Sequence, residues 1–157
     1  MKLTEAKALL VELLKKHKLL EKGWGFKFDS AKRRFGCCNY RKRLIQLSEP
    51  LVLLNSTEQV TDTILHEIAH ALTGPGIGHS FAWKTICTSI GANPSRCYDS
   101  NEVLAPPAKY VLVCPNCGKK SPRQKRTRKR YACSSCCKKY SGGRFDAKFL
   151  LQLKLNK

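Results

Sequence analysis

Hydrophobic residues recur at helical spacing in three segments of the chain. In residues 3–20 they alternate with lysine and glutamate, which predicts an amphipathic helix capped by Thr4 that packs on the core. A second helix is predicted over residues 56–72, which open with the capping-box sequence Ser-Thr-Glu-Gln. The third is predicted over residues 80–90, where the packing stripe consists of Phe81, Trp83, Ile86 and Ile90.

Between the first two helices the hydrophobic spacing changes to every second residue. Residues 24–28, 34–38 and 43–47 therefore predict three short antiparallel strands. The sequence Ser-Glu-Pro interrupts the last of them, and the apolar residues 51–54 are expected to form a short turn before the second helix. A small antiparallel sheet combined with amphipathic helices indicates an α+β domain.

The second helix carries a His-Glu-x-x-His motif. His66 and His70 are four residues apart, so a helix points both imidazoles to one side, where together they can bind one Zn²⁺. Glu67 lies beside them, and a carboxylate in this position can take a proton from a water whose pKa zinc lowers to ~7. The motif predicts a catalytic zinc with Glu67 as the general base in the hydrolysis of an amide.

A catalytic zinc site uses three protein ligands, and two residues compete for the third place. His79 follows a glycine-rich turn after His70 and begins the third helix, so its ring can face the motif. Cys87 is the alternative, but it would fall too far down the helix if the aromatic residues before it are packed. We therefore favour His79.

Charge divides the chain into two parts. The 30 lysines and arginines exceed the 11 acidic residues and give a net charge of +19, and residues 105–157 contain 15 of the basic residues but only one acidic residue. Two prolines, at 106 and 107, mark the change in composition, so we predict one domain at 1–104 and another at 105–157. The second domain is expected to end in a short strand over residues 148–153. A chain this basic is expected to bind a polyanion, most often nucleic acid.

The second predicted domain contains two Cys-x-x-Cys pairs. Cys114 with Cys117 and Cys133 with Cys136 have the spacing of a structural zinc ribbon, in which Cys137 is an alternative to Cys136. Nine cysteines in a chain without a recognisable secretory signal suit metal binding better than disulfide bonds. We expect one structural Zn²⁺ here.

A strongly basic segment lies between the two cysteine pairs. Laid along phosphates, such a segment would release counterions, which favours DNA binding; a solvated loop or a localisation signal is the alternative. The residues predicted to bind nucleic acid are Lys119, Lys120, Arg123, Lys125, Arg126, Arg128, Lys129 and Arg130.

In the order of its motifs the chain resembles the SprT-like, or Spartan-type, zinc metalloprotease family. The resemblance extends from about Leu3 to Phe149 and ends with the four-cysteine ribbon. The segments that carry it are residues 35–38, 45–51 and 63–71, and Gly78-His79 with an aromatic residue at Trp83. It implies a zincin-like metalloprotease domain in which His66, His70 and His79 bind zinc and Glu67 is the general base. The family often has glycine where this chain has Ser80.

The resemblance implies DNA-stimulated proteolysis of proteins that are bound or covalently crosslinked to DNA. Two other functions stay open: a nucleic-acid-binding zinc protein whose histidine site is structural or inactive, and a zinc hydrolase of small amides. We expect one catalytic and one structural zinc, DNA and DNA-bound proteins as partners, no membrane partner, and a monomer. The expected location is intracellular, in the cytoplasm or nucleoid, or in the nucleus of a eukaryote.

Overall fold

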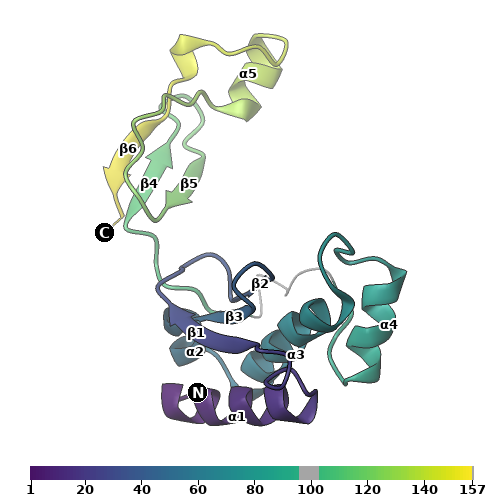
Figure 1. Cartoon of the computed structure of the whole chain (residues 1–157). Helices are drawn as coiled ribbons and strands as arrows, with labels where there is room; N and C mark the ends of the chain where they lie inside the picture. The colour runs from purple at the N-terminus through teal and green to yellow at the C-terminus, as the bar shows by residue number, and fades with distance from the viewer. Residues whose placement is uncertain (96–102, 157) are drawn as a thin grey trace. The chain divides into compact units, whose positions relative to one another are not determined.

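The computed structural model describes residues 1–95 and 103–156 (Figure 1). The chain divides into two compact units, Met1–Pro106 and Pro107–Lys157, which we call the N-terminal and the C-terminal unit. Both combine helices with a small three-stranded sheet, so the protein is of the α+β class. Among the described residues, no helix has both the length and the apolar character needed to span a membrane.

The sheet of the N-terminal unit is mixed. Its strands lie in the order β1-β3-β2, and the central strand β3 is parallel to β1 and antiparallel to β2. The prediction of three antiparallel strands was therefore wrong for β1, because the chain leaves β1, forms the β2–β3 hairpin and inserts β3 between the other two strands. The described elements of this unit are α1 (Leu3–Lys16), β1 (Gly25–Asp29), β2 (Gly36–Asn39), β3 (Leu44–Ser48), α2 (Glu49–Leu54), α3 (Thr57–Thr73) and α4 (Phe81–Ser89).

Helix α1 begins and ends differently from the prediction. Lys2 is its N-cap residue, and the backbone N–H of Lys2 donates to the Glu5 carboxylate at 3.0 Å, so the predicted cap at Thr4 was wrong. The helix ends at Lys16 rather than at residue 20, because the backbone turns there with the hydrogen bonds of a Schellman motif. The remaining residues up to 23 form turns.

Serine residues cap the later helices of this unit. The hydroxyl of Ser48 accepts a backbone hydrogen bond, so residues 51–54 belong to helix α2 and not to the predicted turn. The capping box of Ser56 and Gln59 at the start of α3 is confirmed. Ser80 caps α4.

The core of the N-terminal unit is apolar and contains buried residues of all four of its described helices and of the central strand β3. Phe81 was predicted to pack in it, but its side chain is 86% exposed, whereas Trp83 is fully buried. Two residues apart on a helix point to nearly opposite sides, so these two cannot both face the core. The largest fully buried side chains are Trp83, Phe35, Leu10, Leu14, Leu19, Ile45, Leu47, Leu51, Ile64, Ile68, Val52 and Val60.

The C-terminal unit has an antiparallel sheet in the order β5-β4-β6. Its described elements are β4 (Tyr110–Val113), β5 (Lys120–Arg123), α5 (Ser134–Tyr140), the 3-10 helix η1 (Ala147–Phe149) and β6 (Gln152–Leu155). The terminal strand therefore starts later than the predicted 148–153 and pairs with β4 of its own unit. The buried cluster of the C-terminal unit consists of Cys114, Cys133, Cys136, Cys137 and Phe149.

Candidate active site and zinc ribbon

Three histidine rings converge beside α3. His66 and His70 lie one turn apart on this helix, and their Nε2 atoms are 3.1 and 3.2 Å from Nε2 of His79. Nitrogen ligands around a tetrahedral zinc, with Zn–N bonds of ~2.0–2.1 Å, are about 3.3 Å apart. The histidine group thus fits a zinc ion bound through three imidazoles, with a fourth position left for a water or a substrate.

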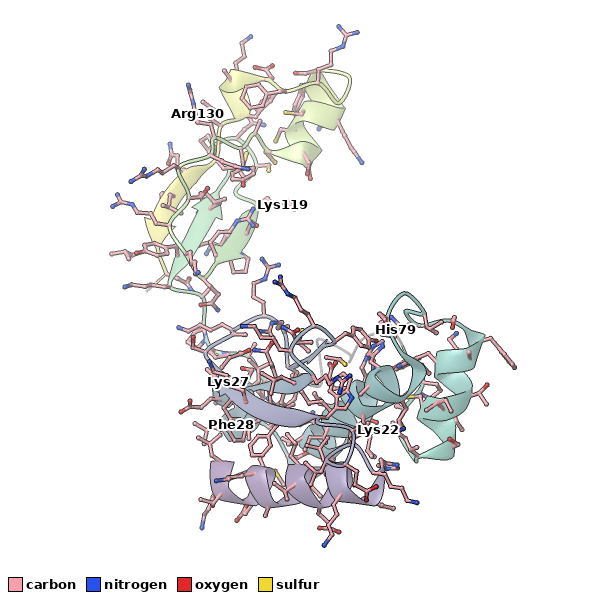
Figure 2. The ribbon with its side chains drawn as sticks, viewed as in Figure 1. Lys22, Lys27, Phe28, His79, Lys119 and Arg130 are labelled. Atoms are coloured by element: carbon pink, nitrogen blue, oxygen red, sulfur yellow. The ribbon has the colours of Figure 1, made fainter. Side chains whose placement is uncertain are left out.

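A glycine-rich loop brings His79 back to α3. Gly74 ends the helix with φ at 93°, and its N–H donates to the His70 carbonyl at 3.0 Å. Gly76 and Gly78 also have positive φ, 82° and 57°, which residues with a side chain adopt only rarely. These conformations reverse the chain within a few residues, and Figure 2 shows His79 in the segment between α3 and α4.

The indole ring of Trp83 packs against all three histidine rings. The centroid of its buried ring lies 4.7 Å from that of His66, 5.1 Å from that of His70 and 4.6 Å from that of His79. The indole stacks on His70 at an interplanar angle of 29° and meets the other two rings edge to face. Because one rigid ring touches all three imidazoles, it restricts the directions in which their nitrogens can point.

The rings of His66 and His70 are neutral near pH 7. Burial, followed by the charges of the neighbouring histidines, lowers the pKa of His66 and of His70 to about 4. A neutral imidazole has a lone pair that can bind a metal, whereas an imidazolium does not. The chemistry of this donor set therefore agrees with its geometry.

Glu67 is buried beside the histidines, with 7% of its surface exposed. Burial raises the pKa of its carboxyl to about 7, against a hydrogen bond from the backbone of Cys38 and the charge of Arg34, which lower it. A group with a pKa near neutrality can both accept and release a proton, as a general base in hydrolysis must.

An open cleft of about 790 Å³ gives access to this group. Residues 33–38 and Tyr40, which include most of edge strand β2, line it together with α3 and the His79 loop. The Tyr40 hydroxyl donates to the His70 carbonyl at 3.1 Å and so ties the end of β2 to α3. Cys87, the alternative third ligand, is buried, and its thiol donates to the Asn93 carbonyl at 3.3 Å, so it is not part of the histidine group.

The second metal-binding group is formed by Cys114, Cys117, Cys133 and Cys136. The sulfur atoms of Cys114 and Cys136 are 3.8 Å apart, and those of Cys117 and Cys133 are 3.6 Å apart. Sulfur ligands around a tetrahedral zinc, with Zn–S bonds of ~2.3 Å, are about 3.8 Å apart, so this group also fits zinc. Cys137 is buried but lies outside the group.

Most of the basic residues between the cysteine pairs are exposed; Figure 2 labels Lys119 and Arg130. Arg123 differs, because it is half-buried and its guanidinium lies 5.3 Å from the centroid of the Tyr131 ring. Asp146, the only acidic residue of the unit, accepts hydrogen bonds from Ser141 and from a backbone N–H. Within the described residues, no ion pair neutralises this basic segment.

Three histidines that can hold a metal ion and a buried carboxylate meet at an open cleft on an α+β domain, an arrangement typical of metalloproteases. The chain belongs to the SprT-like family, whose model matches residues 6–102, more than half of its length. Searches of curated proteins and of solved structures found no match to this chain. The family assignment agrees with the resemblance seen in the sequence.

Two residues of the cleft escaped sequence reasoning. Gly36 lies against Glu67, and Tyr40 bridges β2 to α3. A glycine inside a strand often marks a close approach of another group, so Gly36 offered a signal that could have been used. Tyr40 offered none, because its position in a hairpin turn says nothing about the helix that the turn will meet.

Proposed function

We propose that this protein is a zincin-like zinc endopeptidase that cleaves proteins bound or covalently crosslinked to DNA. The observation that carries the proposal is the convergence of His66, His70 and His79 beside the buried Glu67 in an open cleft. Membership of the SprT-like family supports the metalloprotease type. The DNA-related part rests on the basic C-terminal unit.

Each residue of the site has its own role in the proposed hydrolysis. Zn²⁺ held by the three histidines would act as a Lewis acid, polarising the scissile carbonyl and lowering the pKa of a water to ~7. Glu67 accepts the proton that the attacking water loses and delivers it to the leaving amine. Trp83 keeps the imidazoles oriented, and the burial of Glu67 keeps its pKa close to neutrality.

Strand β2 offers a way to hold substrates of many sequences. It is the edge strand next to α3, and Gly36, Cys37 and Cys38 line the cleft. An extended peptide can pair with such an edge through backbone hydrogen bonds, which do not depend on its side chains. We therefore expect cleavage at many sequences, with selectivity arising from recruitment to DNA.

The C-terminal unit is proposed to be a zinc ribbon that binds DNA. Four cysteines would fill the coordination sphere of a zinc, which suits a structural site. The basic segment is exposed and forms no salt bridge within the part of the chain that the structure describes. Each phosphate contact would release counterions, so binding should weaken steeply with salt.

The test uses the purified, zinc-loaded full chain and a DNA-binding protein as substrate, with and without DNA. We expect cleavage that DNA stimulates, and a loss of ~10²–10⁴-fold in rate for Glu67→Gln with an unchanged zinc content. Glu58→Gln, which changes an exposed carboxylate in the first turn of the same helix, is the matched control and should keep the activity.

Other outcomes would favour the other functions. Activity that survives Glu67→Gln unchanged would refute the protease mechanism. DNA binding without any cleavage would point to a nucleic-acid-binding protein with a structural histidine site. Turnover of small amides that is indifferent to DNA would point to a small-amide hydrolase.

A further inference from the structure

We propose that strand β2 fixes the position of the Glu67 carboxylate, with Gly36 as the positioning residue. A Cβ atom added at Gly36 would lie 2.6 Å from Oε1 of Glu67, 2.7 Å from its Cγ and 3.0 Å from its Cδ. Non-bonded carbon atoms in contact are ~3.5–4.0 Å apart. The Glu67 side chain can therefore occupy its position only because residue 36 has no Cβ atom. The backbone of Cys38 hydrogen-bonds to the same carboxylate from one pleat further along.

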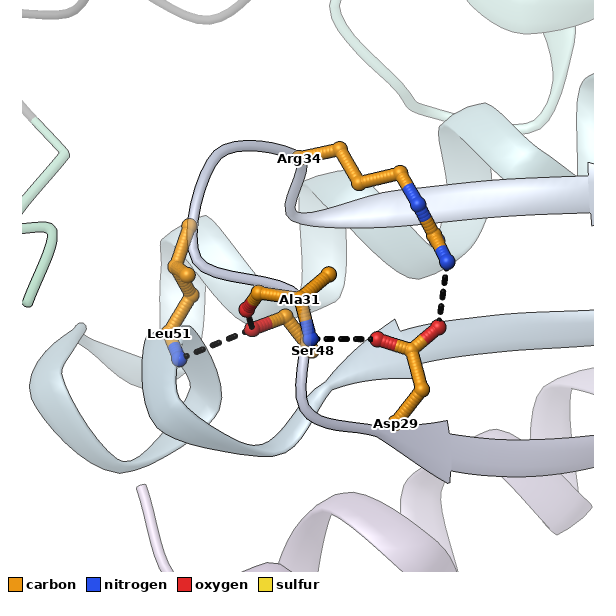
Figure 3. Close-up of polar contacts among 5 residues, drawn as sticks. All are labelled: Asp29, Ala31, Arg34, Ser48 and Leu51. Carbon is orange, nitrogen blue, oxygen red and sulfur yellow. Dashed lines mark hydrogen bonds and ion pairs between the residues drawn. The ribbon is translucent and has the colours of Figure 1, made fainter. Parts of the chain in front are cut away.

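The start of β2 is anchored, so the strand cannot easily retreat from Glu67. Figure 3 shows the polar contacts of the preceding loop. Asp29 accepts a hydrogen bond from the Ala31 N–H at 2.9 Å and pairs with Arg34. Ser48 donates to the Ala31 carbonyl and accepts from the Leu51 N–H at 3.2 Å, which joins the loop to β3 and α2.

The strand itself is held on both sides of Gly36. Phe35 is 1% exposed, and its carbonyl accepts a hydrogen bond from the Ser48 N–H at 2.8 Å. Beyond the strand, Tyr40 is hydrogen-bonded to His70 on α3. The part of this contact that can move is the end of the Glu67 side chain. A methyl group at position 36 would displace the carboxylate while the surrounding fold persists.

Backbone strain does not complicate this substitution. The φ of Gly36 lies outside the positive region, so alanine can adopt the same backbone conformation. Gly25 in β1 provides a matched control, because it is also a strand glycine without positive φ. A Cβ there would meet only the Cδ2 atom of Leu44, at 3.3 Å, which is the end of a side chain that can rotate.

The kinetic test rests on the proposed function, since it takes Glu67 as the general base. In the full chain, cleaving the same DNA-binding protein, Gly36→Ala should lower kcat by about 10²-fold, because small displacements of a catalytic group have effects of this size. KM and zinc content should stay at the wild-type values, and Gly25→Ala should behave as wild type. A kcat within about twofold of wild type, or a loss of zinc, would overturn the proposal.

A second measurement does not depend on activity. Gly36→Ala should lower Tm in the wild-type background but leave it unchanged in the Glu67→Ala background, where the new methyl group occupies the space that the glutamate has vacated. An equal decrease in both backgrounds would overturn the proposal. If the protein proved to have no peptidase activity, the proposed function would fail while this coupling still tested whether β2 positions Glu67.

Discussion

The two metal-binding groups differ in what the surrounding protein supplies. The histidine group is attached to a unit with its own apolar core, which includes Leu10, Ile45 and Ile64. In the C-terminal unit the cysteines are themselves most of the core, with Phe149 as the main apolar partner. We infer that the first unit can fold without its metal, whereas the second depends on it.

The two groups also differ in the number of ligands that they offer to a metal ion. Four thiolates complete a tetrahedral zinc site and leave no place for a substrate, as in structural sites. Three imidazoles would leave one position of a bound zinc open, and the three histidines line the cleft together with Glu67. We infer that the two groups, both able to bind the same ion, serve different tasks, since the number of ligands and the surroundings of the two groups differ.

The largest effect is expected from the cysteine group. Cys117→Ala should abolish the ordered C-terminal unit, because zinc binding contributes ~10–16 kcal/mol to the folding of such small domains. NMR spectra should lose the dispersed signals of residues 107–156, and metal analysis should show one zinc fewer per chain. Cys137→Ala, a buried cysteine outside the ligand group, is the control and should keep both. A folded C-terminal unit in Cys117→Ala would break the comparison.

The corresponding change in the histidine group should spare the fold. His79→Ala should remove the other zinc and abolish proteolysis, but far-UV circular dichroism should show the N-terminal unit still folded, because its core contains no metal ligand. His17→Ala, at the only histidine outside the group, should retain the zinc. Unfolding of the N-terminal unit by His79→Ala would show that this site, too, is structural.

The local motifs were predictable because their spacing alone determines their geometry. Four residues on a helix place His66 beside His70, and a Cys-x-x-Cys pair brings its two sulfurs together. The capping box of Ser56 was readable for the same reason. His79 needed one further step, since only the length and glycine content of the loop indicated that it could return.

The relations between distant segments were not predictable from spacing. Alternation identified the strands but could not show that β3 inserts beside β1 in parallel, because parallel and antiparallel pairing give the same period. Phe81 was assigned to the core although it lies two residues from Trp83 on a helix, an error that helical geometry could have prevented. The contact of Gly36 with Glu67 depends on how β2 meets α3, which no local pattern encodes.

The basic segment of the C-terminal unit should control the salt dependence of DNA binding. Replacing four exposed cations by glutamine should make the slope of log K against log salt shallower by about 3.6 for duplex DNA, if each contacts one phosphate. Fluorescence anisotropy at several salt concentrations measures the slope. The four are Lys125, Arg126, Arg128 and Lys129. Replacing Lys7 and Lys15 of α1, also exposed, is the control. A change of about 1.8 in the slope there, about 0.9 for each cation, would place the DNA surface elsewhere.

The Trp83 ring, which packs on the three histidine rings, should affect zinc affinity more than folding. Trp83→Phe keeps an aromatic ring but is too small to contact all three imidazoles, so we expect zinc to bind about 10-fold more weakly, as when other supporting groups of metal sites are changed. Competition with a chelator measures this affinity. Trp24→Phe, at a tryptophan whose ring packs on Tyr40 rather than on a histidine ring, should leave it unchanged. Unaltered affinity in Trp83→Phe would mean that α3 and the loop position the ligands unaided.

The smallest effect is expected at the end of β2. Tyr40→Phe removes the hydroxyl that donates to the His70 carbonyl at 3.1 Å, and one hydrogen bond of this kind contributes about 1 kcal/mol to the free energy of unfolding. Urea unfolding should show a lower midpoint with an unchanged m value. The N-terminal unit should stay folded, because its apolar core and the other hydrogen bonds that hold β2 remain. If Tyr40→Phe unfolded this unit, the unit would depend on a single contact, as the C-terminal unit is expected to depend on single sulfur atoms. The contrast between the two units would then no longer hold.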